Sequence, residues 1–487
     1  MRTWQAQRSR VEIAVLGVTL VLGALLALRG SRSRLTYDEG TYLLSVFDLQ
    51  GGQALGTDVY APQPPLFYNV VRLAMWAFGP DVVDVRKGII AVFLMGAVGA
   101  YLLVRALVGP WAGLAAAAFV VVAPPIPFEA ARVHADLPAL ALTLLALGLA
   151  AQRPGARAGR LFLAFSAGAL LMIAVGVKLT ALIGVVPLVL LLARPPRSTA
   201  RFAAAAVGAA ITVAVVLLVY RHALGSLWSS LVEYRQAARD TPNLISRREV
   251  LDTVLDLHSA FTIALLTGAA LAAWRLIRER SVASALVLLP VIALALLAAL
   301  ALATYRPLHD NHLVLASAAL AVLAAALIGW GAAPLSTGGQ TVIAALMVVL
   351  AVGAFSQGWR RVGVELEATS PDVVRLADRL AERTPVTALV VSDNPGIAYL
   401  ARRRTPGTLV DTARLRFETG SLTNASVLQS VDRSCVAAVV AARAFLLRPR
   451  LLVAFNERFA SVETSTAGRL YHGRRTPCPK DAEPIAP

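Results

Sequence analysis

Long uninterrupted apolar segments recur along most of this chain, and they limit its fold more than any other feature does. A helix needs about 20 apolar residues to cross a bilayer, and in lipid it must satisfy its own backbone hydrogen bonds. About eleven segments approach this length, near residues 11–29, 88–107, 111–126, 137–152, 161–177, 179–193, 202–220, 259–274, 282–303, 313–330 and 341–358. The sequence therefore predicts a mostly α-helical protein that crosses a membrane many times.

Two features of this pattern leave alternatives open. The segments 111–126 and 137–152 are short for a bilayer span. The segments 161–177 and 179–193 are separated by almost nothing, so they form either a tight helical hairpin or one broken helix.

Charge and composition agree with a membrane protein. Hydrophobic residues make up 57% of the chain and charged residues only 15%, and the net charge is +17. The arginines concentrate beside the apolar segments, where they anchor helices and meet anionic lipid. They do not form a basic stripe interleaved with aromatic residues, so we expect no nucleic-acid partner.

The arginines also predict an orientation. Short Arg-rich connectors remain in the cytoplasm, and four of them, near residues 2–10, 153–160, 194–201 and 275–280, fall on one side of the predicted spans. Arg32, Arg34 and the uncharged connector 331–340 run against this pattern. We predict a plasma-membrane protein with a cytoplasmic N-terminus, an extracytoplasmic C-terminus and a retained first span rather than a cleaved signal peptide.

The sequence changes character near residue 359. We expect residues 1–358 to form the transmembrane domain, with an external loop at 30–87, and residues 359–487 to form a small extracytoplasmic α/β domain. A helix is predicted to start at Ser370 and Pro371. The strands of this domain are predicted at 387–391, 408–411 and 436–441. The domain also contains both cysteines, Cys435 and Cys478. Outside the cytoplasm these form either a disulfide or two unpaired thiols.

An adjacent carboxylate pair lies in the first external loop, in the segment Leu35–Tyr42. Asp38 and Glu39 are flanked by Tyr37 and Tyr42. Two neighbouring anions repel, and a divalent cation or an incoming proton relieves the repulsion. The alternative is a solvated turn, or a pair that caps the following helix.

A proline-rich stretch follows in the same loop. It contains Gln63, Pro65 and Tyr68, and prolines hold such a segment in an extended path. The next residues, 66–78, have the pattern of an amphipathic helix at the membrane interface. The alternative is a rigid connector.

A second external turn contains Glu129, Arg132, His134 and Asp136, the last of which opens a predicted span. Asp is a good N-cap residue, which would explain Asp136 without any chemistry. Lys178 lies between two apolar segments at the predicted outer surface. Its amine either reaches water or binds a phosphate.

A late external turn contains Arg306, His309 and His312. Histidines three residues apart with nearby carboxylates can bind a metal. Neutral histidines in a turn are more common, so this turn alone predicts little.

The order of these elements is more informative than any one of them. Tyr-Asp-Glu-Gly-x-Tyr is followed by Pro-x-Pro-Pro-Leu-x-Tyr, His-x-Asp-x-Pro, Lys-x-Thr-Ala-Leu and His-Asp-Asn-His. This order resembles the GT-C superfamily of membrane glycosyltransferases. Within it, the chain is most similar to the protein O-mannosyltransferase-like branch, with the bacterial aminoarabinose transferase of lipid A as a cousin. The resemblance covers nearly the whole chain.

The resemblance implies roles for individual residues. Asp38 corresponds to the catalytic base, with Glu39 beside it, and Asp136 to the acidic residue of the second loop. We expect four residues to bind the donor phosphate: Lys178, Arg306, His309 and His312. We expect six more to line the donor and acceptor site: Tyr37, Tyr42, Gln63, Pro65, Tyr68 and His134.

The implied reaction moves a hexose or pentose, with inversion, from a polyprenyl phosphate to a hydroxyl of a glycan, lipid or protein outside the cytoplasm. A divalent metal (Mg²⁺, Mn²⁺ or Zn²⁺) held by Asp38, Glu39 and Asp136 is left open. The chain lacks two basic residues of the lipid A enzyme, having Thr41 and Gln63 instead, which argues against lipid A as acceptor.

Two other classes of protein fit part of the pattern. A transporter or flippase of a lipid-linked saccharide would share the spans and their charges. Such proteins have discontinuous spans, charges near the midplane and internal repeats, whereas here no repeat is evident and the charges cluster at the outer ends. A scaffolding membrane subunit would explain the spans but gives no reason for the Asp38–Glu39 pair.

Overall fold

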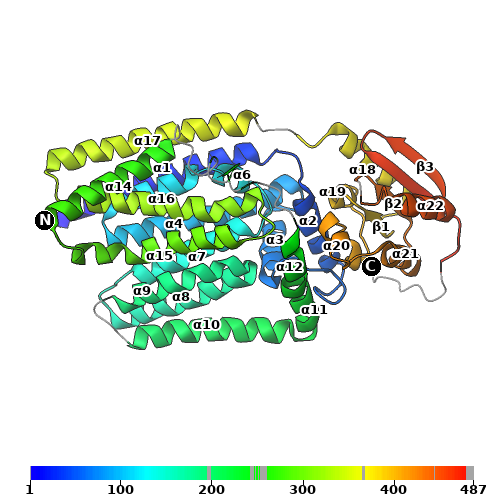
Figure 1. Ribbon diagram of the computed structural model, residues 1–487, viewed down its shortest axis with the longest axis horizontal. Helices are drawn as coiled ribbons and strands as arrows, with labels where there is room; N and C mark the ends of the chain where they lie inside the picture. The colour runs from blue at the N-terminus through cyan, green and yellow to red at the C-terminus, as the bar shows by residue number, and fades with distance from the viewer. Residues whose placement is uncertain are drawn as a thin grey trace. The chain divides into compact units, whose positions relative to one another are not determined.

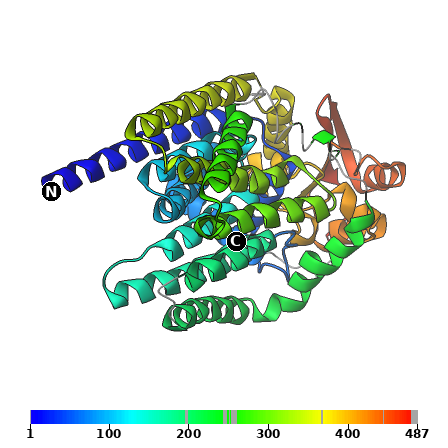
Figure 2. The ribbon, with the colours of Figure 1, turned by 60° about the vertical axis from the view of Figure 1, so that its left-hand side comes forward.

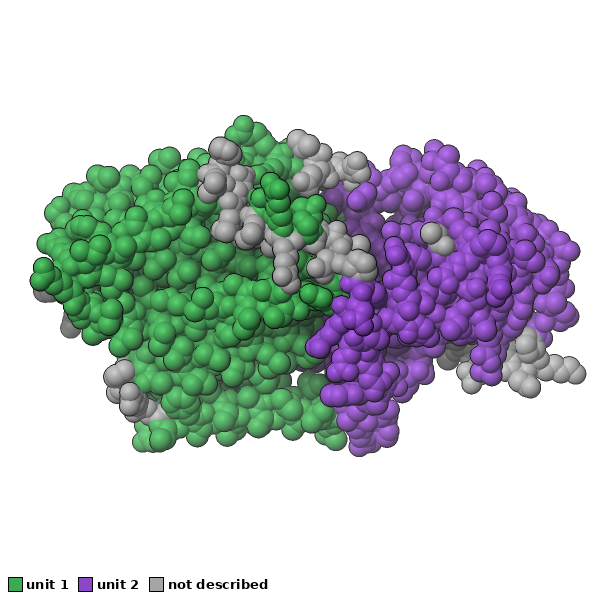
Figure 3. Space-filling model, viewed as in Figure 1, with its two compact units in different colours: residues 1–31, 86–219, 242–365 green, residues 32–85, 220–241, 366–487 purple. Residues whose placement is uncertain are grey.

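The computed structural model describes residues 2–194, 199–241, 246, 248–249, 252, 260–364, 368–443 and 445–478. It divides into two compact units, shown in green and purple in Figure 3. Unit 1 comprises residues 1–31, 86–219 and 242–365, and unit 2 comprises residues 32–85, 220–241 and 366–487. Each unit is therefore assembled from separate stretches of the sequence.

Unit 1 is built from helices, most of them long and apolar (Figure 1). They are α1 (Arg2–Gly30), α4 (Val82–Leu107), α5 (Pro110–Val122), α6 (Ile126–Glu129), α7 (Asp136–Ala151), α8 (Arg157–Val177), η1 (Leu179–Gly184), α9 (Val185–Ala193), α10 (Thr199–Val219), α14 (Ala260–Glu279), η5 (Ala283–Leu288), α15 (Leu289–Thr304), η6 (Asp310–His312), α16 (Leu313–Ala332) and α17 (Thr337–Val364).

The predicted membrane architecture is confirmed by these helices. Among the described residues, eight helical segments are long and apolar enough to cross a membrane, and the shorter apolar helices Pro110–Val122, Asp136–Ala151 and Leu179–Ala193 occupy three further predicted spans. The chain is thus a polytopic, mostly α-helical membrane protein.

Small residues allow neighbouring helices of unit 1 to pack closely. A side chain at Gly99 of α4 would collide with the backbone of α7, and one at Gly148 of α7 would collide with α4. Gly168 of α8 and Gly208 of α10 have the same reciprocal relation. Apolar side chains gain little from each other in lipid, so this close backbone approach stabilises the bundle through van der Waals contact.

The segments 161–177 and 179–193 form a hairpin and not one broken helix. Lys178 separates α8 from η1 and has an extended backbone, with φ −155° and ψ 131°. The helix η1 packs against both α8 and α9, and α8 contacts α9. The turn places Lys178 at the tip of the hairpin.

Unit 2 contains a four-stranded sheet. Its strands are β1 (Val390–Ser392), β2 (Ala438–Ala441), β3 (Phe459–Ser465) and β4 (Gly468–Arg474), in the order β1-β2-β4-β3. The β1–β2 pair is parallel, with Val391 opposite Val439, and the other pairs are antiparallel, with Tyr471 opposite both Val439 and Val462.

Of the helices of unit 2, α18 (Pro371–Arg383), α19 (Pro395–Leu400) and α22 (Pro449–Arg458) pack against this sheet. The other helices of this unit are α2 (Tyr37–Gln50), α3 (Pro65–Phe78), η2 (Arg221–Ala223), α11 (Leu224–Trp228), η3 (Ser229–Glu233), α12 (Tyr234–Ala237), η4 (Ala238–Asp240), η7 (Gly407–Leu409), α20 (Arg414–Glu418) and α21 (Asn424–Arg433).

Some details of unit 2 follow the sequence and others do not. Ser370 caps α18 through a hydrogen bond to the N–H of Asp372, as its position before Pro371 predicts. The strand predicted at 408–411 is wrong, because this segment begins with the 3₁₀ turn η7. The β3–β4 hairpin was not predicted, because every residue of β3 after Phe459 is exposed or half-exposed, and β3 lacks the apolar run that marks the buried β1 and β2.

The two cysteines form a disulfide within unit 2, between Cys435 and Cys478. This settles the alternative that the sequence leaves open. The bond ties the start of β2 to the segment that follows β4.

The loop predicted to be external, residues 32–85, packs against the C-terminal segment. Helix α2 contacts α19, and a side chain at Gly40 would meet the backbone N–H of Gly396. Leu35 N–H donates to Thr369 Oγ1 at 3.0 Å, and Thr405 N–H donates to Asp48 Oδ1 at 3.3 Å. The loop that carries the carboxylate pair is therefore part of unit 2.

Candidate functional site

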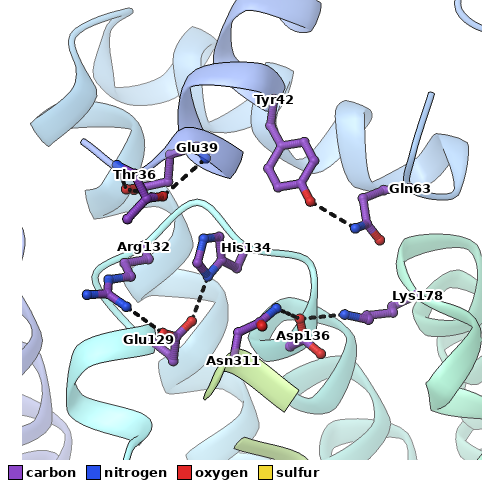
Figure 4. A network of polar contacts seen from close by, with 10 residues as sticks. All are labelled: Thr36, Glu39, Tyr42, Gln63, Glu129, Arg132, His134, Asp136, Lys178 and Asn311. Carbon is purple, nitrogen blue, oxygen red and sulfur yellow. Dashed lines mark hydrogen bonds and ion pairs between the residues drawn. The ribbon is translucent and has the colours of Figure 1, made fainter. Parts of the chain in front are cut away.

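Two side chains from separate elements of unit 1 converge on the carboxylate of Asp136. Lys178, at the tip of the α8–η1 turn, places Nζ 2.5 Å from Asp136 Oδ2. Asn311, in η6, donates from Nδ2 to the same oxygen at 2.7 Å. Figure 4 shows both side chains pointing toward Asp136 from different helices. The sequence singled out Asp136 and Lys178 separately, and the fold brings them together.

Asp136 does not cap its helix, which was the alternative explanation for this residue. It is the first residue of α7, and its N-cap residue, Ala135, has no side-chain hydrogen bond. The carboxylate nevertheless lies at the N-terminal, positive end of the helix dipole. Its side chain and that of Lys178 are 7% and 5% exposed, so the ion pair is largely shielded from water.

The ammonium group of Lys178 has capacity beyond this ion pair. It carries three N–H donors, and one of them is directed to Asp136. A second anion near Nζ would meet a cation that is already oriented by Asp136 and by the turn. Lys178 is therefore suited to bind a phosphate oxygen.

A second buried cluster lies in the turn between α6 and α7. Glu129 accepts from Arg132 Nη1 at 2.9 Å through Oε1 and lies 2.7 Å from His134 Nδ1 through Oε2. Burial alone would raise the pKa of Glu129, but His134 and Arg132 outweigh it and hold that pKa below its usual range. The cluster fixes the backbone just before Asp136.

The turn that contains His309 and His312 is stabilised by contacts between its own rings. His309 N–H donates to His312 Nδ1 at 3.2 Å, and the two imidazoles lie 5.4 Å apart in an edge-to-face arrangement. Tyr305 lies against His312 with ring centroids 4.0 Å apart. Arg306 is exposed at the start of the turn. In this arrangement His312 supports the turn that presents Asn311.

The two carboxylates of the first loop have different surroundings in helix α2. Glu39 is buried and forms a capping box, in which Thr36 N–H and Oγ1 each lie 3.1 Å from Glu39 Oε2. Asp38 is exposed in the first turn of α2. The capping alternative thus accounts for Glu39, and Asp38 is the member of the pair whose carboxylate faces outward.

Tyr37, directly before Asp38, is anchored to the C-terminal segment. Its hydroxyl donates to Asp411 Oδ1 at 2.9 Å, and the guanidinium of Arg443 lies 5.1 Å from its ring centre. Burial raises the pKa of Tyr37, and the charge of Asp411 raises it further, so the phenol remains protonated at neutral pH. Asp411 also accepts from Ala413 N–H at 2.9 Å.

An aromatic cluster supports the other side of α2. Gln63 Nε2 donates to the hydroxyl of Tyr42 at 2.8 Å, and both side chains are buried. The ring of Tyr42 packs edge-to-face on Phe67 at 4.9 Å and on Tyr68 at 6.4 Å. Pro65 opens α3 at its first position, as is common for proline. These residues hold α2 against α3.

The described residues do not form an evident metal site. No group of three or more His, Cys, Asp or Glu side chains in the described ranges is arranged to hold a metal ion. Glu39 is engaged by Thr36, and Asp136 by Lys178 and Asn311. Two of the three carboxylates expected to share a metal, Glu39 and Asp136, therefore have other partners.

Three contributors to these arrangements were not assigned from the sequence. Glu129 was visible only as one charge in a polar turn, and Asn311 only as a residue between two histidines. Asp411 had no local signal at all, because its partner, Tyr37, is remote in the sequence.

The fold identifies the class of protein that the chain resembles. Solved structures that share this fold include GT-C membrane glycosyltransferases, which confirms the fold that the sequence motifs imply.

Three of these structures illustrate the similarity. ArnT from Cupriavidus metallidurans, solved with bound undecaprenyl phosphate, has a TM-score of 0.64 and 16% identity over 94% of this chain and 97% of its own. An oligosaccharyltransferase from Archaeoglobus fulgidus, solved with Zn and sulfate, gives 0.51 and 14% over 94% and 73%. The arabinofuranosyltransferase AftD from Mycobacteria gives 0.55 and 14% over 95% and 40%. No protein-family model and no curated protein matches the chain.

Proposed function

We propose that this protein is an integral membrane glycosyltransferase that moves a sugar from a polyprenyl-phosphate donor to an acceptor hydroxyl on the extracytoplasmic side of the plasma membrane. The observation that carries the proposal is the fold, which the chain shares along nearly its whole length with a protein solved with bound undecaprenyl phosphate. The acceptor is a glycan, a lipid or a protein, and the sugar is a hexose or a pentose.

In this proposal Asp38 acts as the general base. The acceptor hydroxyl gives its proton to Asp38 while its oxygen bonds to the anomeric carbon. The bond between that carbon and the phosphate oxygen breaks, and the polyprenyl phosphate leaves on the opposite face, so the anomeric centre is inverted. The exposure of Asp38, in contrast to the buried Glu39, supports this assignment.

Lys178 stabilises the leaving phosphate in the same proposal. A fixed cation aimed at developing negative charge lowers the barrier without reorganisation during the reaction. The ion pair with Asp136 and the hydrogen bond from Asn311 to Asp136 support this role, because they hold the amine in one position. Asp136 is then a positioning residue, and the turn of Arg306, His309 and His312 contributes to the same donor site.

The disulfide supports the proposed orientation. Disulfides persist in oxidising compartments outside the cytoplasm, and Cys435 and Cys478 are bonded within unit 2. The arginine-rich connectors belong to the opposite ends of the spans. The N-terminus is therefore proposed to be cytoplasmic and unit 2 extracytoplasmic.

Sugar transfer in proteoliposomes tests the proposal. The purified protein receives a set of labelled polyprenyl-phosphate sugars and a membrane extract as acceptor. We expect label to enter an acceptor with release of polyprenyl phosphate, and NMR of the product to show an inverted anomeric centre. Chelator followed by Mg²⁺, Mn²⁺ or Zn²⁺ measures the metal requirement. Label that crosses the membrane without leaving its lipid phosphate would instead identify a flippase.

A further inference from the structure

Arginines gather where α7 ends and α8 begins, and again where α9 ends and α10 begins. Four of them make up the arginine cluster: Arg153, Arg160, Arg194 and Arg201. The helices α7 to α10 pack against one another. Between Asp136, at the far end of α7, and Glu233, in unit 2, the sequence contains no acidic residue.

Arg201 is the most unusual member of the cluster. It is only 4% exposed, and Nη2 donates to the carbonyl oxygen of Ala150 at 2.7 Å. Its Nε is buried and has no hydrogen-bond partner among the described residues. Arg160 caps the same turn, donating from Nη1 to Pro154 O at 3.1 Å and to Gly155 O at 2.6 Å. Each guanidinium has five N–H donors, so these carbonyl contacts use only part of their capacity.

The positive charges of the cluster act on one another. Arg153 and Arg160 interact unfavourably with Arg201, and burial together with Arg153 and Arg201 lowers the pKa of Arg194. The positive electrostatic potential of these arginines favours the binding of an anion.

Glu12, an acidic residue near the end of α4, already contacts residues of that helix. Gln152 Nε2 donates to Leu102 O at 2.9 Å, which places the end of α7 beside the last turns of α4. There Glu12 bonds to Arg105 at 3.2 Å and to Tyr101 at 3.1 Å. Glu12 is therefore committed to a different arginine.

The ordinary explanation is that these residues form a solvated, orientation-setting loop. That explanation suits the exposed Arg153 but not Arg201, which is buried and has no anionic partner within the part of the chain that the structure describes. An unpaired buried cation is costly. We propose that the arginine cluster binds the phosphate group of an anionic membrane phospholipid. This site goes beyond the proposed transfer reaction and lies apart from its residues.

The surroundings of the cluster favour a lipid over a free phosphate. Phe162, two residues after Arg160 on α8, is 68% exposed, and Val207 and Ile211 of α10 are about half exposed. These apolar side chains offer contact to acyl chains while the headgroup meets the guanidinium groups. Basic pockets between membrane helices bind anionic headgroups in this manner.

Native mass spectrometry of the full-length protein with phosphatidylglycerol tests the proposal. Because Arg201→Gln can disturb folding, the informative variants are Arg153→Gln and Arg194→Gln. Each is expected to weaken phosphatidylglycerol binding about fivefold, the effect of one arginine near an anionic headgroup. The matched control is Arg157→Gln, which changes an exposed arginine of the same connector outside the cluster and should leave binding within about twofold.

Three results would overturn the proposal. One is an equal loss in the Arg157→Gln control, which would mean diffuse surface charge. Another is equal binding of phosphatidylcholine, whose headgroup has no net charge. The third is displacement of the lipid by millimolar inorganic phosphate, which would identify a free-phosphate site.

Discussion

At the scale of single residues, the Asp136–Lys178 pair is the best-defined polar contact of the candidate site. The sequence presents both residues at the predicted outer ends of spans, so each was visible as a charge in an unusual place. Their contact, and the third partner Asn311, depend on how three helices pack, which no local pattern encodes. Their roles in catalysis stay predictions.

Changing one member of this pair should affect stability and activity differently from changing both. Lys178→Gln or Asp136→Asn alone leaves a buried charge without its partner, which costs about 3–5 kcal/mol. The double variant Lys178→Gln/Asp136→Asn should recover most of that stability. Its sugar transfer should remain about 10²–10³-fold below wild type, because the cation at the leaving phosphate is gone.

Thermal unfolding in detergent and sugar transfer in proteoliposomes measure the two effects separately. If the double variant regains activity along with stability, Lys178 has a structural role only.

Asp393 makes the stability of unit 2 depend on pH. Burial raises its pKa to about 6, although its carboxylate accepts hydrogen bonds from the N–H groups of Ala442, Arg443 and Leu446. The folded state therefore binds this proton more tightly than the unfolded state does. The resulting stability is present below about pH 4 and is lost as the pH rises through about 6, by roughly 3 kcal/mol.

Hydrogen exchange of the β2 amides between pH 4 and 7, corrected for intrinsic rates, measures this dependence. Asp393→Asn should remove it, whereas Asp378→Asn, at an exposed position of α18, should leave it in place. An unchanged slope in Asp393→Asn would assign the dependence to another group.

At the scale of elements, the positions of the helices were more predictable than the elements against which they pack. The apolar segments of unit 1 and the capped start of α18 follow local rules. The β3–β4 hairpin escaped prediction because its residues are mostly exposed or half-exposed, and a segment with few buried apolar residues gives only a weak signal. The packing of α2 against α19 could not be predicted either, since it joins segments about 350 residues apart in sequence.

The contact between α2 and α19 is tight enough to test. Gly40→Ala would push a methyl group into the backbone of Gly396, and overpacking of this kind costs about 1–3 kcal/mol. Gly225→Ala is the control, because a methyl group at this helical position of unit 2 meets nothing within 4 Å. We expect a lower unfolding temperature and faster proteolysis of unit 2 for Gly40→Ala alone. Similar behaviour of the two variants would argue against this packing.

The hydroxyl of Tyr37 links the first turn of α2 to Asp411. Tyr37→Phe removes the donor and leaves the buried carboxylate with one hydrogen bond fewer, at a cost of about 1–3 kcal/mol. Because Asp38 is the next residue, kcat should fall several-fold with little change in KM for the donor.

Asp411→Asn keeps an oxygen that accepts this bond and should retain most of the kcat. A loss in Asp411→Asn equal to that in Tyr37→Phe would show that the charge of Asp411, and not its anchoring bond, matters.

At the scale of the whole molecule, the units do not follow the order of the sequence. The loop 32–85 belongs with residues 366–487, although spans separate them along the chain. The division into consecutive domains at residue 358 stays a prediction about folding and function. In the proposed enzyme, this grouping attaches Asp38 to the extracytoplasmic segment, so that segment contributes directly to the position of the base.

The fold could be predicted at this scale because long apolar segments indicate membrane helices, and the order of the motifs indicates the family fold. The grouping of segments could not, because it rests on single contacts such as that of Gly40 with Gly396 and of Tyr37 with Asp411. The sequence likewise left undecided whether Cys435 and Cys478 form a disulfide, because their proximity depends on the tertiary fold.

The most direct test of the account is sugar transfer by Asp38→Asn in proteoliposomes, with Asp58→Asn, in the same loop, as the matched control. A general base contributes about 10²–10⁴-fold to the rate, so kcat should fall by that factor in Asp38→Asn and by less than about twofold in Asp58→Asn. Binding of the polyprenyl-phosphate donor should be retained in both variants. Full transfer activity in Asp38→Asn would contradict the assignment of the base, and label that only changes leaflet in wild type would contradict the transferase itself.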